Sequence, residues 1–531
     1  MARREIERSM QALQASGPPG VDGYPVQFGP WQGGVNYAAT GDNTQPNELY
    51  AMLNTEVDPA GQCVKRPGFD VFNSSALNSA ATVTALGYHE FTAASSSNFA
   101  IIGNKFYESL SGTPADRTGG LTITAGDDKT WHFADANGTL VGNNGVSGDA
   151  LIKWTAAGGN IAALTVDSRF TWAKWWAWWD GRVWAANNSV STDQTNYSSN
   201  SDIETWAATD YVNLTTDVTG IAPMGNEFLV IHGKDRVDII SPTNVSDQPY
   251  QRYARASYGT VSGRAIATVP KPGGGHHQVY PRRDGFYSFD GNGEARKISQ
   301  RLDGERYWEN VNKDRLFQSF QITYPRKNCV WFWIPYGSGQ TNMNHVIIYD
   351  YLRNIFYGPY DGTGTVMERN AGALINDIPH AGGLSTGYVY KHETANNDDD
   401  NTTNNKIDGW FETSSIPPQG LDMRCRWYHA IIAHQATGLW SLNVTQMTPG
   451  ISSNEYSFDM TGGFDAVGTT FTVGTSSIGG GKSTSLEEMR LEGYDPYSMI
   501  KVRNAEASQH YKIRSITQVF KPLGKHRNIH A

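Results

Sequence analysis

The chain has 531 residues, and its 52 acidic and 43 basic side chains leave a net charge of −9. This length exceeds what one hydrophobic core usually covers, so we expect two or three structural units. The excess of acidic residues argues against non-specific binding of nucleic acid. It does not exclude a surface past which DNA slides.

The first twenty residues, MARREIERSMQALQASGPPG, are predicted to form an N-terminal arm over 1–20. Their Arg and Glu pattern indicates a short helix over residues 3–15 or a mobile arm. They lack the apolar stretch of a secretory signal, and the chain contains no run of eighteen apolar residues, so we expect no membrane insertion. Three cysteines lie far apart without a CxxC pair, which predicts no disulfide framework: Cys63, Cys329 and Cys425. Synthesis in the cytoplasm is the natural expectation.

Residues 76–400 contain repeated hairpins whose turn glycines can be counted. The glycines are Gly103, Gly138, Gly181, Gly233, Gly285, Gly337 and Gly387. The first two steps are 35 and 43 residues, and the later steps are 52, 52, 52 and 50. A period near 50 with short strands is typical of propeller blades, which have four strands in about 40–50 residues. The sequence therefore predicts an all-β fold with a β-propeller of six or seven blades. The preceding segment, 21–75, has few clear strands and is expected to pack on the other domains or to close the propeller.

The stretch WWAWWDGRVWAANN, residues 175–188, holds five of the sixteen tryptophans. Trp172, Trp175, Trp176 and Trp179 would share one face of a helix, but Asp180-Gly181 between two apolar runs favours a hairpin. Such a cluster could be a stacking platform for sugars or bases, or it could be core. Blades pack face to face and the other hairpins lack a tryptophan cluster, so core packing is the favoured interpretation.

The acidic run NNDDDNTTNN, residues 396–405, is predicted to be a solvated linker or a long loop that ends the repeats. Beyond it, residues 401–531 indicate seven strands without the repeat period. In one of them, alternation places five residues on one face: Met423, Cys425, Trp427, His429 and Ile431. The expectation is a C-terminal β-sandwich, jelly-roll-like in character.

No motif for catalysis, cofactor or metal passes its spacing test. SSIGGGKST at 476–484 resembles a phosphate loop, but Ser476 stands where Walker A needs glycine. His276-His277 has no third ligand nearby and is expected at a loop tip. We therefore predict no catalytic residues, no cofactor and no metal.

Four aspartates could still serve a glycosidase, since paired carboxylates on propeller loops perform that chemistry. They are Asp180, Asp235, Asp284 and Asp290. Each stands in a turn beside Gly or Lys, where Asp caps its own backbone, so a turn role explains them without catalysis.

Five stretches, taken in order, resemble a known family. They are WQGGVN (31–36), PNELYAMLNTEVDPAGQCVKRPGF (46–69), YSSNSDIETW (197–206), SYGTVSGRAIATV with DGFYSFDGNGEARKIS (257–299) and NHVIIYDYLRNIFY (344–357). They are similar to the tail nozzle proteins of short-tailed bacteriophages, also called tail tubular protein B or packaged-DNA stabilisation proteins. The matched positions are Gly33, Gly34, Asn36, Asn54, Gly61, Arg66, Pro67, Gly68, Ser201, Trp206, Asp284, Gly285, Tyr287, Phe289, Asp290 and Gly291. The chain is shorter than many members, which puts insertion domains and some fibre contacts in doubt.

The resemblance implies a structural virion protein of the tail, assembled in the host cytoplasm. Such proteins form a ring of identical subunits, commonly six, below the portal and adaptor rings. The implied partners are other copies of the chain, the adaptor or portal ring, tail fibres or tailspikes, and the double-stranded genome in the lumen. A neutral or acidic wall suits that lumen, because basic walls would bind phosphates and slow ejection. The glycine tips at 272–275 and 479–481 are candidate gate loops, and the basic tail KPLGKHRNIH, 521–530, is a candidate docking arm or a frayed end.

Two other functions stay open. One is a phage receptor-binding or glycan-degrading propeller, with aromatic residues and carboxylates on one face. The other is a cellular sensor or scaffold propeller, against which the absence of repeat signatures of the GH…WD type counts.

Overall fold

The computed structural model describes residues 23–166, 169–243, 245, 249–362, 364–400, 403–415, 417, 423–438, 440–448, 451–460 and 484–525. The predicted N-terminal arm, with its helix over 3–15, lies outside them, as do residues 476–483 of the phosphate-loop look-alike, which include the glycine tip at 479–481. The described residues are all-β. The helical elements among them are 3₁₀ turns: η1 (Asn78–Ala80), η2 (Gly263–Ala265), η3 (Gln300–Leu302), η4 (Trp308–Asn310), η5 (Leu316–Gln318) and η6 (Pro325–Lys327). In this part of the chain, no helix is long and apolar enough to cross a membrane.

Seven antiparallel sheets follow one another along the described chain from Val83 to Ala395. In order, they are β6–β9 (Val83–Thr92, Ser95–Ile102, Lys105–Glu108, Ala115–Asp116), β10–β13 (His132–Ala136, Thr139–Asn143, Ile152–Trp154, Ala162–Ala163), β14–β17 (Ala173–Trp179, Arg182–Asn188, Gln194–Tyr197, Tyr211–Asn213), β18–β21 (Val218–Met224, Phe228–Gly233, Arg236–Pro242, Tyr250–Ser257), β22–β25 (Ala267–Pro270, His276–Arg282, Gly285–Phe289, Arg296–Lys297), β26–β29 (Phe320–Tyr324, Cys329–Ile334, His345–Asp350, Ile355–Tyr360) and β30–β32 (Arg369–Ile375, Ile378–Gly383, Val389–Ala395) with β5 (Gly68–Val71).

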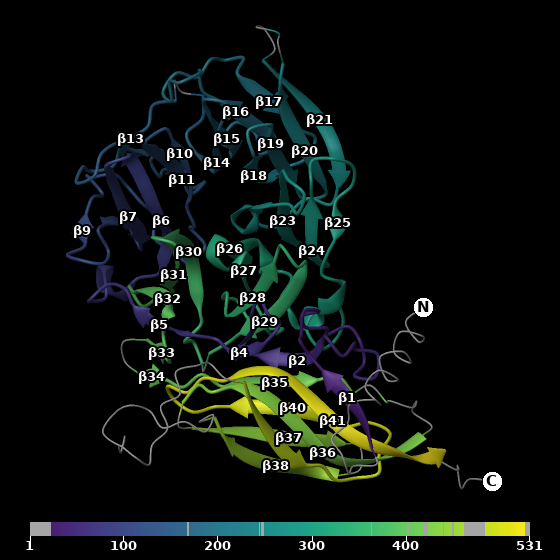
Figure 1. Cartoon of the computed structure of the whole chain (residues 1–531). Helices are drawn as coiled ribbons and strands as arrows, with labels where there is room; N and C mark the ends of the chain where they lie inside the picture. The colour runs from purple at the N-terminus through teal and green to yellow at the C-terminus, as the bar shows by residue number, and fades with distance from the viewer. Residues whose placement is uncertain are drawn as a thin grey trace. The chain divides into compact units, whose positions relative to one another are not determined.

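The sheets close into a ring, and the propeller has seven blades in the described residues (Figure 1). Strand β30 of the last blade packs on β6 of the first, where Val83 and Ala371 share one apolar cluster. The last blade takes its fourth strand, β5, from before the first blade, pairing Phe69 with His392. The predicted all-β propeller is therefore confirmed, and an early segment does close it.

The acidic run after the last blade is not a solvated linker throughout. Two short strands, β33 (Asp398–Asp399) and β34 (Asn404–Asn405), continue the sheet of the seventh blade beyond β5. Asp398 is buried and pairs in register with Phe69. Composition alone misjudged this segment, because a neighbouring strand edge can fix even a polar run in place.

The turn glycines mark one hairpin in each blade, but not the same one. Gly138 and Gly181 join first and second strands, whereas the other five lie between second and third strands. The first strands themselves begin at Val83, His132, Ala173, Val218, Ala267, Phe320 and Arg369. The blade count was correct because every blade contributed one recognisable turn. The even spacing of the glycines suggests equivalent hairpins, but the hairpins occupy two different positions within their blades.

The tryptophan stretch forms the first hairpin of the third blade. Trp179 pairs with Arg182 across a two-residue turn in which Asp180 and Gly181 have φ of 52° and 70°. These are the positive angles of the expected primed turn. Alternate residues of β14 pack against two different apolar clusters. Trp176 belongs to the cluster shared with the second blade, and Trp178 lies at its margin. Trp175 and Trp179, together with Trp184 of β15, belong to the cluster shared with the fourth blade. Strand β14 is covered on both faces, so the core interpretation is confirmed for the buried tryptophans of the stretch, whereas Trp178 is only half-buried.

The second architectural part is a two-sheet sandwich. One sheet has the order β3-β4-β41-β36-β39, with β1 paired to β41, and the other has the order β2-β35-β40-β37-β38. The strands are β1 (Tyr24–Phe28), β2 (Leu49–Leu53), β3 (Thr55–Val57), β4 (Cys63–Lys65), β35 (Gly409–Thr413), β36 (Met423–Gln435), β37 (Ser441–Thr448), β38 (Ile451–Asp459), β39 (Thr484–Arg490), β40 (Met499–Asn504) and β41 (Lys512–Lys525). Strand β41 includes the first half of the basic tail, so residues 521–525 are not a free arm.

The compact units differ from the predicted linear domains. One comprises Met1–Pro67, Ile355–Tyr360 and Asn405–Ala531, and the other comprises Gly68–Asn354 and Asp361–Asn404. The prediction let residues 21–75 pack on the other domains or close the propeller, and it gave only residues 401–531 to the sandwich. Its strands β1 to β4 come instead from the N-terminal segment that ends at Lys65, which no local pattern in the C-terminal stretch could indicate.

The alternation predicted for β36 holds for only part of the strand. Cys425 and Trp427 are buried, but the pairing with β41 shifts register between Trp427 and His429. Beyond that shift the buried residues are Ala430, Ile432 and His434, while His429 and Ile431 are half-buried. A bulge inserts one extra residue and therefore reverses which side chains face the core.

Candidate functional site

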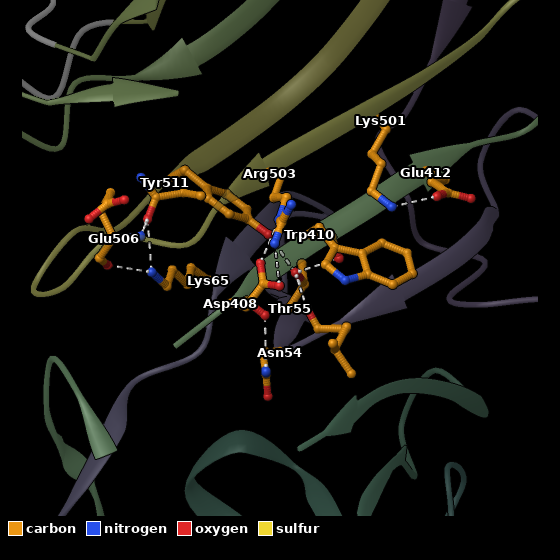
Figure 2. Close-up of polar contacts among 12 residues, drawn as sticks. Asn54, Thr55, Lys65, Asp408, Trp410, Glu412, Lys501, Arg503, Glu506 and Tyr511 are labelled. Carbon is orange, nitrogen blue, oxygen red and sulfur yellow. Dashed lines mark hydrogen bonds and ion pairs between the residues drawn. The ribbon is translucent and has the colours of Figure 1, made fainter. Parts of the chain in front are cut away.

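Two of the N-terminal motif residues, Asn54 and Arg66, are buried and hydrogen-bonded within the sandwich unit. Figure 2 shows Asn54 with the polar residues around it. Asn54 stands between β2 and β3 with φ of 50°, and its side-chain amide donates to the Asp408 carbonyl oxygen at 3.0 Å. Its side-chain oxygen accepts from Nε of Arg66 at 2.7 Å. Arg66 is 1% exposed, so both matched positions satisfy buried hydrogen-bonding groups.

The polar residues around Asn54 include some that the motif did not contain. The hydroxyl groups of Thr55 and Tyr511 lie 2.5 Å apart, and Nζ of Lys65 donates to Oδ1 of Asn504 at 2.8 Å (Figure 2). Burial raises the pKa of Tyr511 well above its ordinary value. Thr55 and Lys65 come from the N-terminal strands, while Tyr511 and Asn504 come from the end of the chain. Their meeting depends on strand pairing between the two ends of the sequence.

In the propeller, the matched positions hold turns and core. Trp206 is 2% exposed, and its indole N–H donates to the Ile203 carbonyl oxygen. Tyr287 donates to Oδ2 of Asp284 at 2.6 Å. A Cβ on Gly285 would stand 2.3 Å from Oγ of Ser299, the atom that accepts from the Phe286 N–H. The motif residues are therefore architectural at these positions.

The four candidate aspartates do not converge. Asp235 and Asp284 follow second strands, whereas Asp180 and Asp290 lie at first-to-second and third-to-fourth connections. In an antiparallel blade, the second-to-third connection lies at one end of the strands, and the first-to-second and third-to-fourth connections lie at the other end. Arg282 lies 3.6 Å from Asp235 and 3.8 Å from Asp284. Each of the four has a bonded or charged side-chain partner. Asp290 also accepts from the Asn292 N–H, which is the backbone cap that the turn interpretation predicts.

One cleft contains a candidate aspartate together with another carboxylate. A cavity of about 270 Å³ is lined by Lys271, His277, Asp290, Glu294 and Tyr349, among others. Burial opposes ionisation of Asp290, but hydrogen bonds from Lys271 and from the Asn292 N–H lower its pKa overall. Asp290 is therefore ionised near neutral pH and unsuited to donating a proton as a general acid.

The histidine pair lies at the start of a strand rather than at a loop tip. His276 and His277 begin β23, with His276 exposed and His277 buried. Burial lowers the pKa of His277. Within the described part of the chain, no group of three His, Cys, Asp or Glu side chains could hold a metal ion.

A second cavity lies among the innermost strands of the propeller. Its volume is about 330 Å³, and its lining comes mainly from β6, β10, β26, β30 and η2. Two basic residues line it, Arg264 and His132, together with the aromatic residues Trp131, Phe133 and Phe320. Sequence analysis did not single out Arg264 or His132, because they belong to separate parts of the repeat.

Glycines bring Arg264 close to the inner strands. A Cβ on Gly220 would lie 2.6 Å from Cα of Gly263, and one on Gly263 would lie 2.7 Å from the Trp175 ring. Without side chains at these positions, η2 can pack directly on β18 and β14. The neighbouring Arg264 guanidinium stacks over Phe320 at 5.2 Å and donates to the carbonyl oxygens of Gln318 and Asn370.

Comparison with known proteins shows likeness in fold only. No family model matches the sequence, and no curated protein matches it. Among solved structures, the computationally designed protein Ika8 aligns over 60% of this chain and 99% of its own, with 13% identity and a TM-score of 0.38. The extracellular domain of a one-component system from B. thetaiotaomicron aligns over 88% of this chain and 62% of its own, with 10% identity and a TM-score of 0.39. An exo-β-1,3-galactanase from Phanerochaete chrysosporium aligns over 85% and 100%, with 10% identity and a TM-score of 0.26. These values carry no inference about function.

Proposed function

We propose that this protein is a structural component of a short bacteriophage tail. In this proposal, copies of the chain form the nozzle ring below the portal and adaptor, extend the DNA channel and retain packaged DNA until ejection. The observation that carries the proposal is the ordered set of motifs between Trp31 and Tyr357 that resembles the nozzle family. Their residues take architectural roles in both units: Asn54 and Arg66 in the sandwich, and Trp206 and Asp284 in the propeller.

The physical properties of the chain are compatible with this role. A propeller buries every inner strand on both faces and is therefore a rigid part on which a ring can be built. Identical subunits close a ring through heterologous contacts, for which the loops at the two ends of the blades offer separate surfaces. The net charge of −9 is compatible with this role, because a strongly basic protein would hold DNA phosphates.

The test is deletion of the gene in the phage that carries it, with complementation by the intact gene. We expect particles with incomplete tails that have lost packaged DNA, measured by electron microscopy and by DNA content per particle. Complementation should restore both. Full particles with intact tails that fail to adsorb would overturn the nozzle role and favour the receptor-binding alternative.

The alternative, a glycan-binding or glycan-degrading propeller, is favoured by one observation. Carboxylates and tyrosines share the cleft of Asp290, Glu294 and Tyr349. The same deletion separates the two functions. A depolymerase would also release reducing ends from host capsule or lipopolysaccharide, and Asp290→Asn would abolish that release.

A further inference from the structure

We propose that the inner cavity of the propeller, lined by Arg264 and His132, binds a small organic oxyanion with a ring or other apolar body. The oxyanion is a carboxylate or a phosphate monoester. This proposal does not depend on the nozzle role, because it rests only on the side chains of the inner strands.

The basic side chains of His132 and Lys174 contact one tryptophan of the third blade, and Arg264 belongs to the η2 turn that packs on the same ring through Gly263. The His132 ring meets the Trp175 ring edge-on at 5.4 Å, and Nζ of Lys174 lies 5.6 Å from the same ring. The backbone of Gly263, next to Arg264, approaches that ring from the η2 side. After burial, the positive charge of Arg264 is the next cause that lowers the pKa of both Lys174 and His132. The three groups therefore lie close enough to repel one another.

This positive charge has little compensation within the propeller. Among the described residues, no carboxylate forms an ion pair with Arg264 or Lys174. The Arg264 contacts are carbonyl oxygens and the face of Phe320. Burial lowers the pKa of Arg264 to about 9, which leaves it charged at neutral pH. A cation enclosed by protein without an anionic partner is costly, and a bound anion would remove that cost.

Two other residues of the wall, His132 and Trp131, carry ring N–H donors. Nδ1 of His132 accepts from the Trp176 N–H at 3.2 Å. Burial and the repulsion from Arg264 lower the His132 pKa to about 4, so the ring is neutral and its proton is on Nε2. The indole N–H of Trp131, in the same wall, has no acceptor among the described residues. An acceptor-rich ligand would complement the Arg264 guanidinium and the Nε2–H of His132, both of which belong to residues that line the cavity.

Two carboxylates near the site limit where the anion can bind. Asp135 also lines the cavity, but it lies 3.1 Å from Nδ1 of His89 and its side chain is 53% exposed. Asp128 raises the pKa of Lys174 and is paired with Lys129 at 2.6 Å. The anionic group is therefore assigned to the Arg264 side. The volume of about 330 Å³ exceeds that of a bare ion, and Phe133 and Phe320 suit an apolar body.

The test is calorimetric titration of the full chain at low salt with benzoate and phenyl phosphate, and with neutral benzamide as a control of the same shape. We expect at least one of the two anions to bind and benzamide not to bind. Which anion binds better separates carboxylate from phosphate recognition. Arg264→Gln should weaken binding at least about tenfold, because a charge-assisted hydrogen bond is lost. Salt should weaken it as well.

Arg283→Gln is the matched control, since Arg283 is 60% exposed and pairs with Asp314 outside the cavity. It should bind like the unaltered chain. If Arg264→Gln does not fold, His132→Phe takes its place, because His132 is the other basic residue that lines the cavity, and it should weaken binding several-fold. Absence of binding by both anions, binding of benzamide equal to that of benzoate, or unchanged affinity in the folded variant would overturn the proposal.

Discussion

At the scale of single residues, the tryptophan stretch shows how one strand serves two interfaces. Trp176 and Trp184 are 1% and 0% exposed, and they lie in different apolar clusters on the two faces of the third blade. Their neighbour Trp178 is only half-buried at the margin of one cluster. The stretch combines large buried area with buried indole donors that all have acceptors, as in the bond from Trp176 to the Ala173 carbonyl oxygen.

We expect Trp176→Ala and Trp184→Ala each to cost about 3–5 kcal/mol of unfolding free energy, because each leaves a cavity in a closed apolar cluster. Trp178→Ala is the matched control and should cost clearly less. Denaturant unfolding followed by circular dichroism measures all three. Equal losses for Trp176→Ala and Trp178→Ala would contradict the assignment of the core.

At the scale of elements, the strand that closes the ring is the one that we expect to detach most readily from its blade. Strand β5 precedes the first blade in the chain yet pairs in the seventh, so the entropy of closing a very long loop opposes its pairing. Phe69 anchors it, with ring contacts to Tyr390 at 5.2 Å and to His392 at 5.1 Å. The Arg369 guanidinium lies 4.7 Å from the same ring.

Phe69→Ala should therefore lower the unfolding free energy by about 3–5 kcal/mol and release the seventh blade first. Hydrogen exchange followed by mass spectrometry should show faster exchange in β32 than in β14. Asp70→Asn is the control: Asp70 is half-buried and accepts one bond from Thr394, which asparagine can also accept. If the seventh blade keeps its protection in Phe69→Ala, closure by β5 does not limit stability.

At the scale of the whole molecule, the sandwich is built from both ends of the chain. Trp31 is fully buried and packs on Phe411 at 5.1 Å, and Lys65 reaches Asn504. Strand β41 pairs with β1 and β4 as well as with β36. The C-terminal stretch therefore lacks part of its core and several strand partners when it stands alone.

The isolated fragment 405–531 should consequently fail to unfold cooperatively with heat, in contrast to the full chain. Adding residues 23–67 as a separate peptide should increase its strand content, because that peptide supplies β1 to β4. Calorimetry and far-UV circular dichroism measure both effects. Cooperative unfolding of the fragment without the peptide would show that the predicted linear domain is autonomous after all.

The sequence by itself determined what depends on near neighbours. The Asp180-Gly181 turn, the one hairpin per blade and the all-β class follow from backbone preferences and strand periodicity within a few residues. The backbone cap that Asp290 provides for Asn292 is of the same kind.

Only the tertiary structure decided what depends on distant partners. The bulge in β36, the burial of Asp398, the closing strand β5 and the N-terminal share of the sandwich each follow from a strand met far along the chain. The cluster of Arg264, His132 and Lys174 is the clearest case. Within its own part of the repeat, each of these residues is an ordinary polar residue, and nothing in the local sequence marks it out. Ring closure brings inner strands from separate blades to one axis, and periodicity within a blade carries no information about which side chains meet there.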